Sequence, residues 1–337
     1  MANSLLELHD DGLYCSQADI YIDPWRPVDK AVITHAHADH ARWGMKKYLA
    51  HQQSKNIMKH RLGADISLQT LAYGETISIN GVKVSLHPAG HIPGSSQVRL
   101  SYQGKVAVIT GDYKTEHDGL SLGFEPLSCH LFVSECTFGL PIYKWEPQHM
   151  VMDKINRWWA KNTEAGRCSV LFTYALGKAQ RIHCHLDLST GPVYLHGAVW
   201  NTHQALSSDG VKLPEAVKVT QDIPKSTFKQ ALVIAPPSAA GTPWMRKFSP
   251  YRTAICSGWM QVRGARRRRA ADAGFVVSDH ADWPGLNEAI LSTGAEEVFL
   301  THGYTDVFAK HLIEQGVNAK ILETLFTGET ADGEEEQ

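Results

Sequence analysis

Several patterns that mark large classes of protein are missing from this sequence. No apolar run approaches the roughly 18 to 20 residues that a membrane-spanning helix needs, and no apolar run follows a basic lead-in near the N-terminus. No internal repeat is found. Of the 337 residues, 43% are apolar, which suffices for a core in one large or two medium domains. We therefore expect a cytoplasmic globular protein with no membrane partner.

The cysteines are few and scattered. None of the six belongs to a C-x-x-C pair, so the sequence predicts neither a disulfide framework nor a zinc site built from thiolates. We expect all of them to be small buried apolar residues. They are Cys15, Cys129, Cys136, Cys168, Cys184 and Cys256.

Charge of one sign is not in excess either. A net charge of −2 gives no general attraction for nucleic acid, so any such attraction must come from a local patch. One arginine run could follow a nucleic-acid backbone, with an ordinary solvated surface as the alternative. Trp259 and Trp283 flank this run and are candidates for stacking on bases, although core packing is the commoner role. The candidate contacts in the run are Arg263, Arg266, Arg267, Arg268 and Arg269.

Histidine, in contrast, is abundant. The chain has 18 histidines, and three of them fall in His35-Ala36-His37-Ala38-Asp39-His40, directly after the buried strand expected at Ala31–Thr34. Imidazole and carboxylate ligands suit zinc or manganese, and a water held between two such ions becomes a hydroxide nucleophile near neutral pH. The segment therefore predicts a hydrolase with two divalent metal ions. Exposed loop histidines are the alternative.

The apolar pattern predicts an α/β chain with two parts. Up to about residue 139, short apolar or β-branched runs separated by Gly, Pro and Asp predict a sheet-rich domain, with helices at 39–49 and 53–62. Between about 140 and 255, apolar strands alternate with helical stretches, as in a parallel sheet built from crossover units. After 256, strands with polar, histidine-bearing ends return. We expect this last segment to rejoin the first domain and the acidic tail 326–337 to be disordered.

The segment His35–His40 has the form H-x-H-x-D-H and resembles the signature of the metallo-β-lactamase superfamily. Further motifs of that superfamily follow in order. Asp23, before Pro24, resembles an aspartate that supports the ligand loop without binding metal, although an ordinary Asp-Pro turn is the alternative. His91 resembles another histidine ligand. Asp112 resembles a carboxylate that bridges both ions.

Downstream segments resemble the β-CASP nucleases, a branch of this superfamily. Glu135, His280 and His302 occupy the positions of three motifs of the branch. Gly177 and Lys178 open a predicted helix in a fourth element, and a helix start of this kind suits a phosphate. The resemblance covers about residues 14 to 325.

This resemblance implies a fold and a site. The fold is an αββα metallo-β-lactamase sandwich formed by 1–139 and 256–325, with an inserted α/β β-CASP domain at 140–255. Metal one would be held by His35, His37, His91 and Asp112. Metal two would be held by Asp39, His40, Asp112 and His302. Catalysis would depend on Asp39, Asp112 and His280, the last as general acid oriented by Glu135 or another carboxylate.

The nearest resemblance within the branch is to bacterial ligase-associated DNA exonucleases. It implies a DNA exonuclease of DNA repair, with DNA favoured over RNA and with a DNA ligase and a helicase as further partners. A pocket for a terminal phosphate would involve Ser95, Ser96 and Lys178. His302 is typical of RNA-acting members, so an RNA nuclease is the alternative. A small-molecule metallo-hydrolase would need neither the insertion nor His280, and an inactive scaffold would have lost ligands.

Overall fold

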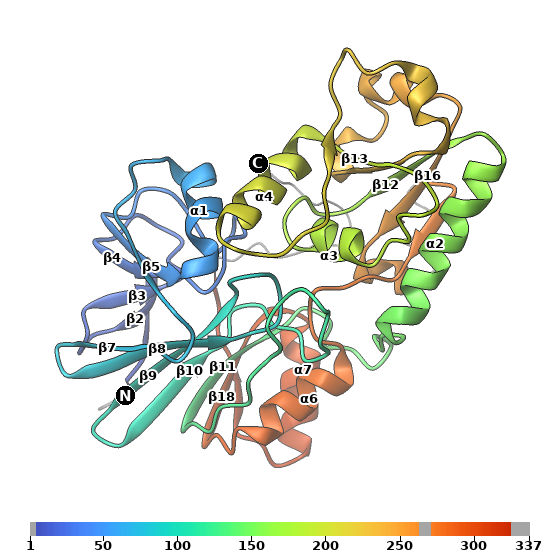
Figure 1. Ribbon diagram of the computed structural model, residues 1–337. Helices are drawn as coiled ribbons and strands as arrows, with labels where there is room; N and C mark the ends of the chain where they lie inside the picture. Colours follow the sequence, from blue (N-terminus) through green and yellow to red (C-terminus); the bar gives the residue numbers. More distant parts are fainter. Residues whose placement is uncertain (1–4, 263–270, 325–337) are drawn as a thin grey trace. The chain divides into compact units, whose positions relative to one another are not determined.

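A computed structural model describes residues 5–262 and 271–324 (Figure 1). These residues form two compact units. The first unit contains the described residues up to Lys144 and those from His280, and the second contains the described residues of Trp145–Asp279. The described chain is a mixed α/β protein with three sheets.

Two sheets build the first unit. One sheet has the order β1-β2-β3-β4-β5-β6, and its strands from β3 to β6 are parallel. Its strands are β1 (Glu7–His9), β2 (Gly12–Cys15), β3 (Ile20–Ile22), β4 (Lys30–Val32), β5 (Lys47–His51) and β6 (Leu68–Leu71). The other sheet has the order β19-β18-β11-β10-β9-β8-β7, and β10, β11, β18 and β19 are parallel. Its strands are β7 (Thr76–Ile79), β8 (Val82–Pro88), β9 (Ser96–Tyr102), β10 (Lys105–Ile109), β11 (Leu131–Cys136), β18 (Glu297–Gly303) and β19 (Ala319–Ile321).

Apolar side chains of the two sheets share one buried core. Leu13, Ile22 and Val32 of one sheet belong to the same cluster as Val84 and Val98 of the other. Because side chains of a strand point alternately to the two faces of its sheet, these buried residues give each sheet an inner apolar face, and the two sheets pack face to face. The first unit is therefore a β-sandwich at its centre.

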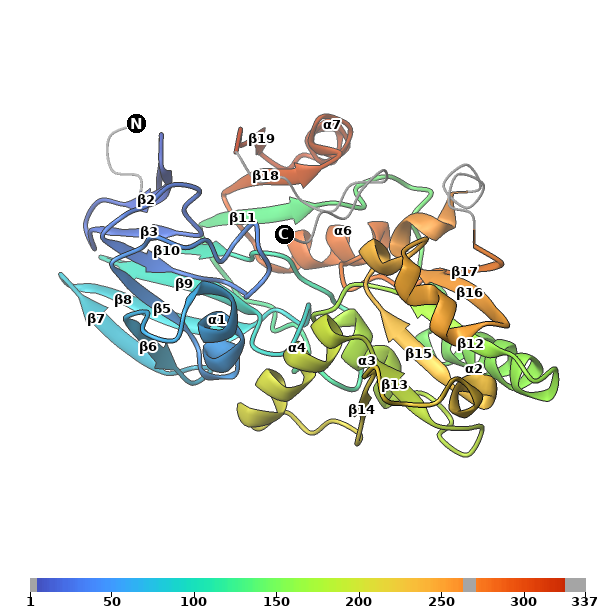
Figure 2. The same ribbon diagram turned by 90° about the horizontal axis from the view of Figure 1, so that it is seen from above.

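Helices complete the first unit. The far face of the second sheet packs on α6 (Trp283–Ser292) and α7 (Thr305–Glu314), which lie beside β18 in Figure 1. A short helix, α1 (Lys55–Leu62), follows the 3-10 turn η1 (Gln52–Ser54) and connects the parallel strands β5 and β6 (Figure 2).

The second unit contains one parallel sheet of order β14-β13-β15-β12-β16-β17, as the alternating pattern predicts. Its strands are β12 (Cys168–Phe172), β13 (Val193–Leu195), β14 (Val217–Lys218), β15 (Leu232–Ala235), β16 (Tyr251–Cys256) and β17 (Ala273–Phe275). Its helices are α2 (Gln148–Glu164), α3 (Lys178–Cys184) and α4 (Gly197–Ser208). Its 3-10 turns are η2 (Lys225–Gln230), η3 (Pro237–Ala239), η4 (Pro243–Phe248) and η5 (Gly258–Gln261). Apolar residues of this sheet and its helices are buried together.

One predicted helix is wrong. No helix occupies 39–49, and its C-terminal part forms the start of β5. Tyr48 and Leu49 are buried and pair with β4, so sheet pairing prevails over the helical pattern. Gly44, with φ of 99°, lies in the turn before the strand.

The division of the chain differs from the expected boundaries. The second unit extends to Asp279, beyond the expected end at 255, because β17 pairs with β16 in the same parallel sheet. The tail 326–337 lies outside the described residues. Five of the six cysteines are buried as predicted, and Cys184 is half-buried. Among the described helices, none is both long and apolar enough to cross a membrane.

Candidate metal centre

The seven predicted metal ligands all lie in the first unit, at or after the ends of strands. His35 and His40 follow β4, and Asp112 follows β10. His91 lies between β8 and β9, and His302 is the next-to-last residue of β18. Since β8, β10 and β18 run in the same direction, their carboxyl ends meet at one edge of the sheet. The strand directions thus gather ligands that are distant in sequence.

The ligand loop is held by the buried Asp23. One oxygen of its carboxylate accepts from the backbone N–H of Thr34 at 2.8 Å, and the other accepts from the Thr34 hydroxyl at 2.5 Å. The second oxygen also lies 2.7 Å from Nδ1 of His40. A carboxylate bound to Nδ1 places the proton there, so Nε2 of His40 is the nitrogen left to bind a cation.

A second loop positions His91. The Ser95 hydroxyl accepts from the backbone N–H groups of His91 and Ile92, at 3.1 and 3.2 Å. Gly90 has φ of 79°, and a Cβ there would lie 2.3 Å from the carbonyl oxygen of Lys114. This close approach explains why glycine precedes the histidine.

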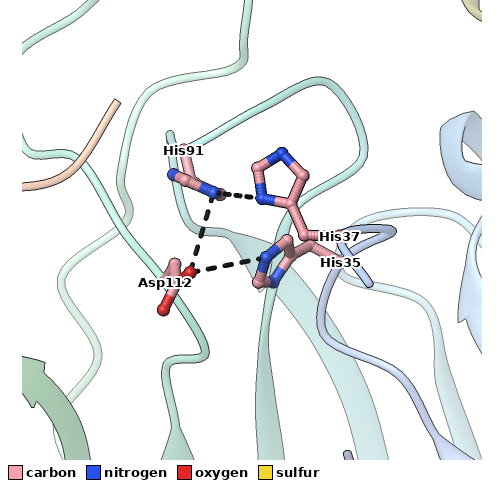
Figure 3. A group of neighbouring side chains, drawn as sticks. All are labelled: His35, His37, His91 and Asp112. Carbon is pink, nitrogen blue, oxygen red and sulfur yellow. Dashed lines mark hydrogen bonds and ion pairs between the residues drawn. The ribbon is translucent and has the colours of Figure 1, made fainter. Parts of the chain in front are cut away.

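Four of the predicted ligands point toward one another in Figure 3. Their ligand atoms, from His35, His37, His91 and Asp112, lie within 4.8 Å of one another. Nε2 of His91 is 3.0 Å from Nδ1 of His37, and Oδ2 of Asp112 is 3.5 Å from Nε2 of His35 and 3.8 Å from Nε2 of His91. A tetrahedral zinc ion with ligands at about 2.1 Å separates them by roughly 3.4 Å. The donors therefore fit one divalent ion.

A second group shares Asp112. Here His40, Asp112 and His302 could hold an ion, and Oδ2 of Asp39 lies 3.6 Å from Nε2 of His40. His302 has φ of 58°, in the left-handed region that non-glycine residues rarely adopt. The Thr301 hydroxyl is hydrogen-bonded to its Nδ1, which leaves Nε2 as the ligand nitrogen.

Burial shapes the charges of this centre. It lowers the pKa of His35 well below 6.5, and neighbouring histidines add to the effect. Burial alone would also lower the pKa of His40, but Asp39, Asp112 and Asp23 raise it to about 10. Without an ion, a proton on His40 balances the buried carboxylates. A bound cation replaces that proton, so metal affinity falls as the pH is lowered.

Two buried atoms of the centre support this fit. Nε2 of His35 and Oδ1 of Asp112 have no hydrogen-bond partner within the described residues. A buried polar atom without a partner costs free energy, and a divalent ion would satisfy both atoms.

Glu135 and His280 form a pair beside the ligands. Oε1 of Glu135 lies 2.8 Å from Nδ1 of His280, and the same carboxylate accepts from the backbone N–H groups of Tyr113 and Thr137. Burial opposes the charge on Glu135, but His280 and these hydrogen bonds lower its pKa. The two residues and Asp112 place ligand-type atoms within 4.8 Å of one another.

The residues predicted to contact a substrate do not belong to the two ligand groups. Ser95 and Ser96 are buried, and their hydroxyls are hydrogen-bonded inside the His91 loop. This favours a role in holding the loop over contact with a substrate. Lys178 is fully buried in the second unit, with Nζ 3.8 Å from Asp279. A fully buried lysine paired with an aspartate is better suited to a structural role than to contact with a substrate. The arginines 263 and 266–269 lie outside the described residues.

Two hydroxyls of the centre were not predicted from the sequence. The Thr34 hydroxyl lies 3.2 Å from Nδ1 of His35, in addition to its bond with Asp23, and Thr301 binds His302 in the same way. In both places a threonine directly precedes a ligand histidine at a strand end. That Thr-His pair is the signal that could have identified them.

Proteins similar to this chain include one named as a probable DNA ligase and one named as an endoribonuclease. A protein of Opitutus terrae named "Probable DNA ligase" is 30% identical over 310 residues, which are 91% of this chain and 30% of that protein. "Endoribonuclease YSH1" of Saccharomyces cerevisiae is 31% identical over 122 residues, 36% of this chain and 15% of that protein. "Cleavage and polyadenylation specificity factor subunit 3" of Dictyostelium discoideum is 25% identical over 36% of this chain and 16% of its own. The chain therefore spans less than a third of each of these relatives.

A solved structure shares the fold. The crystal structure of a protein of unknown function from Enterococcus faecalis V583 matches with a TM-score of 0.59 at 13% identity, over 87% of this chain and 79% of the other. No family model matches the chain.

The shared position of Asp112 predicts unequal effects of two substitutions. Asp112→Asn should lose both ions, because Asp112 belongs to both ligand groups, whereas His37→Asn should lose the ion of one group only. Elemental analysis after dialysis against zinc or manganese measures this. Asp306→Asn, at an exposed position on α7, is the control and should keep the wild-type metal content. Full metal content in Asp112→Asn would contradict the assignment.

The Asp23 network predicts a weaker but intact centre when its charge is removed. Asp23→Asn keeps the size of the side chain but loses the charged acceptor of His40, so metal affinity should fall by about 10- to 100-fold. Competition with a chromogenic chelator gives the dissociation constant. Asp29→Asn removes an exposed carboxylate paired with Lys46 and should change nothing. Equal affinities in the two variants would refute the supporting role of Asp23.

Proposed function

We propose that the protein is a nucleic-acid phosphodiesterase that uses two divalent metal ions, zinc or manganese. It is a member of the β-CASP branch of the metallo-β-lactamase superfamily, in which the first unit is the metallo-β-lactamase sandwich and the second is the β-CASP domain. The observation that carries this proposal is the Glu135–His280 pair, which lies beside Asp112. Cleavage of a phosphodiester needs a group that gives a proton to the leaving oxygen, in addition to the metal ligands, and this pair suits that role.

Different residues of the chain have different roles in the proposed reaction. His35, His37, His91 and Asp112 hold one ion, and Asp39, His40, Asp112 and His302 hold the other. When bound, the two ions supply an activated water and neutralise charge on the phosphate oxygens. Asp23 and Thr34 keep the ligand loop in place, because a small shift of the reacting groups costs much of the rate.

His280 donates the proton that the leaving oxygen needs. Glu135 holds Nδ1 of the imidazole, so Nε2 is the nitrogen that exchanges the proton. The charge of Glu135 stabilises the protonated ring before the transfer. The ring of His280 lies 4.7 Å from that of His91, between ring centres, which places the proton donor beside the first ligand group.

We propose DNA ends as the substrate and DNA repair as the setting, with a DNA ligase and a helicase as partners. The match to the protein named "Probable DNA ligase" covers 91% of this chain, whereas the matches to the named endoribonuclease cover 36%. This difference favours DNA. His302 and the endoribonuclease relatives favour the second candidate, an RNA nuclease of the same branch. A small-molecule hydrolase is disfavoured because it needs neither the second unit nor His280.

A comparison of matched substrates tests the choice of nucleic acid. With manganese or zinc, end-labelled linear DNA should be degraded faster than RNA of the same sequence by about tenfold or more in kcat/KM. Circular single-stranded DNA should resist, because an exonuclease needs an end. Faster cleavage of RNA would favour the second candidate, and cleavage of the circle would identify an endonuclease.

The proposed role of His280 predicts a dependence on the leaving group. His280→Ala should lower kcat on DNA by about 10²- to 10⁴-fold, because an alkoxide needs a proton to leave. Cleavage of bis(p-nitrophenyl) phosphate should fall much less, since p-nitrophenolate leaves without protonation. Metal content measured in parallel should be that of wild type. Equal losses on both substrates would rule out His280 as the general acid.

A further inference from the structure

Segment 51–73 contacts both histidine loops of the metal centre. It leads from the last residue of β5 through η1, α1 and β6 and ends two residues after β6. The two loops are joined to each other, because the backbone N–H of Ser96 donates to the carbonyl oxygen of Thr34 at 2.8 Å. Side chains of segment 51–73 donate to carbonyl oxygens in each loop. One segment therefore holds the backbone that carries three ligands of the first ion.

Arg61, the next-to-last residue of α1, is bonded to the ligand loop. Its Nη1 donates to the carbonyl oxygen of Ala36, which lies between His35 and His37 in the sequence. Ala36 is fully buried, so water competes little for this oxygen, and a charged donor forms a stronger hydrogen bond than a neutral one. The guanidinium thus fixes the backbone between two ligands of the first ion.

Two hydroxyls of segment 51–73 hold the His91 loop. The Ser54 hydroxyl donates to the carbonyl oxygen of Gly94 at 3.2 Å, and the Tyr73 hydroxyl donates to that of Ser95 at 2.8 Å. Gly94 has φ of 83°, and a Cβ there would lie 2.5 Å from the Ser54 hydroxyl, so the two backbones are close. The Tyr73 ring stacks on the ring of the buried His51, with 3.6 Å between ring centres. This stack fixes the direction of the Tyr73 hydroxyl.

The histidine ligands of the second ion have supports in other parts of the first unit. Asp23 lies 2.7 Å from Nδ1 of His40, and the Thr301 hydroxyl is bonded to Nδ1 of His302. Asp112 belongs to both ligand groups. The two ions therefore share one carboxylate but have histidines that are held from different places.

We propose that Arg61 and Tyr73 are positioning residues for the first ion, and that they set its affinity without setting that of the second. Ligands whose backbone is fixed before binding lose less conformational freedom when the ion binds. The inference rests on the two-ion centre of the proposed function. It adds that the two ions have separate supports, so that each can be weakened without the other.

Three variants and two controls test this. Arg61→Ala removes the charged donor, Arg61→Lys keeps a charged donor, and Tyr73→Phe removes only a hydroxyl. Arg157→Ala is the control for arginine, since Arg157 is exposed and donates to a carbonyl oxygen within α2. Tyr102→Phe is the control for tyrosine, at the last residue of β9. Thermal unfolding of the metal-free proteins checks that each variant folds.

Competition with a chromogenic chelator measures the dissociation constants of the two ions. Arg61→Ala should raise one constant by about 10- to 100-fold and leave the other unchanged. Arg61→Lys should restore part of this loss. Tyr73→Phe, which loses one neutral hydrogen bond, should raise the same constant by about 2- to 10-fold. Both controls should match wild type.

A second background identifies the weakened ion. His37→Asn should retain only the second ion, so adding Arg61→Ala to it should not change the remaining dissociation constant. Hydrogen exchange in the metal-free protein gives a readout that needs no ion. Exchange of residues 33–41 should be faster in Arg61→Ala than in wild type or Arg157→Ala, because the loop opens more often.

The outcomes distinguish this inference from the proposed function. If Arg61→Ala raises both constants equally, or neither, the inference is overturned and the proposed function stands. A weaker remaining ion in the double variant would also overturn it. A wild type that binds two ions but cleaves neither DNA nor RNA would overturn the proposed function, while selective loss of the first ion would still support the positioning role. Fewer than two ions in saturated wild type would overturn both.

Discussion

The buried carboxylate of Asp23 connects the framework of the first unit to its ligands. Its backbone N–H donates to the carbonyl oxygen of Val32 in β4, while its side chain holds Thr34 and His40. An acceptor with this many bonds is costly to bury unless all are made, so the loop has one favoured conformation. Asp112 approaches the same point from the other sheet. Gly111, with φ of 56°, allows this, since a Cβ there would lie 2.4 Å from the Thr34 hydroxyl.

Balance of charge explains the composition of the centre. Asp39, Asp112 and Glu135 are carboxylates in a buried site, and burial opposes their ionisation. Protonated His40 and the His280 pair offset part of that cost. Divalent cations offset more, because they satisfy lone pairs that protons leave without a partner. A site of this kind is therefore more stable with metal, and its ligands are held in place before the ions bind.

The two units contribute different parts of the proposed activity. The first unit contains every residue assigned to metal binding and proton transfer. The second unit is a parallel α/β domain whose buried Lys178 and Arg181 contact Asp279. The match to the protein named for a DNA ligase covers 91% of this chain, whereas the match to the named endoribonuclease covers 36%.

The sequence by itself predicted a ligand set, through the H-x-H-x-D-H segment and the resemblance that the later His and Asp residues support, and the structure brings ligand-type atoms of that set close together. It also determined most strands and the parallel sheet of the second unit, through their apolar pattern. It failed for β5, where pairing with β4 prevails over a helical pattern, and for the boundary at Asp279, which depends on pairing of β17 with β16. Only the tertiary structure decided that Glu135 holds His280, that Ser95 serves its own loop and that Trp43 is exposed. Glu135 and His280 are 145 residues apart, the Ser95 bonds depend on the conformation of the loop, and exposure depends on packing, none of which the local pattern encodes.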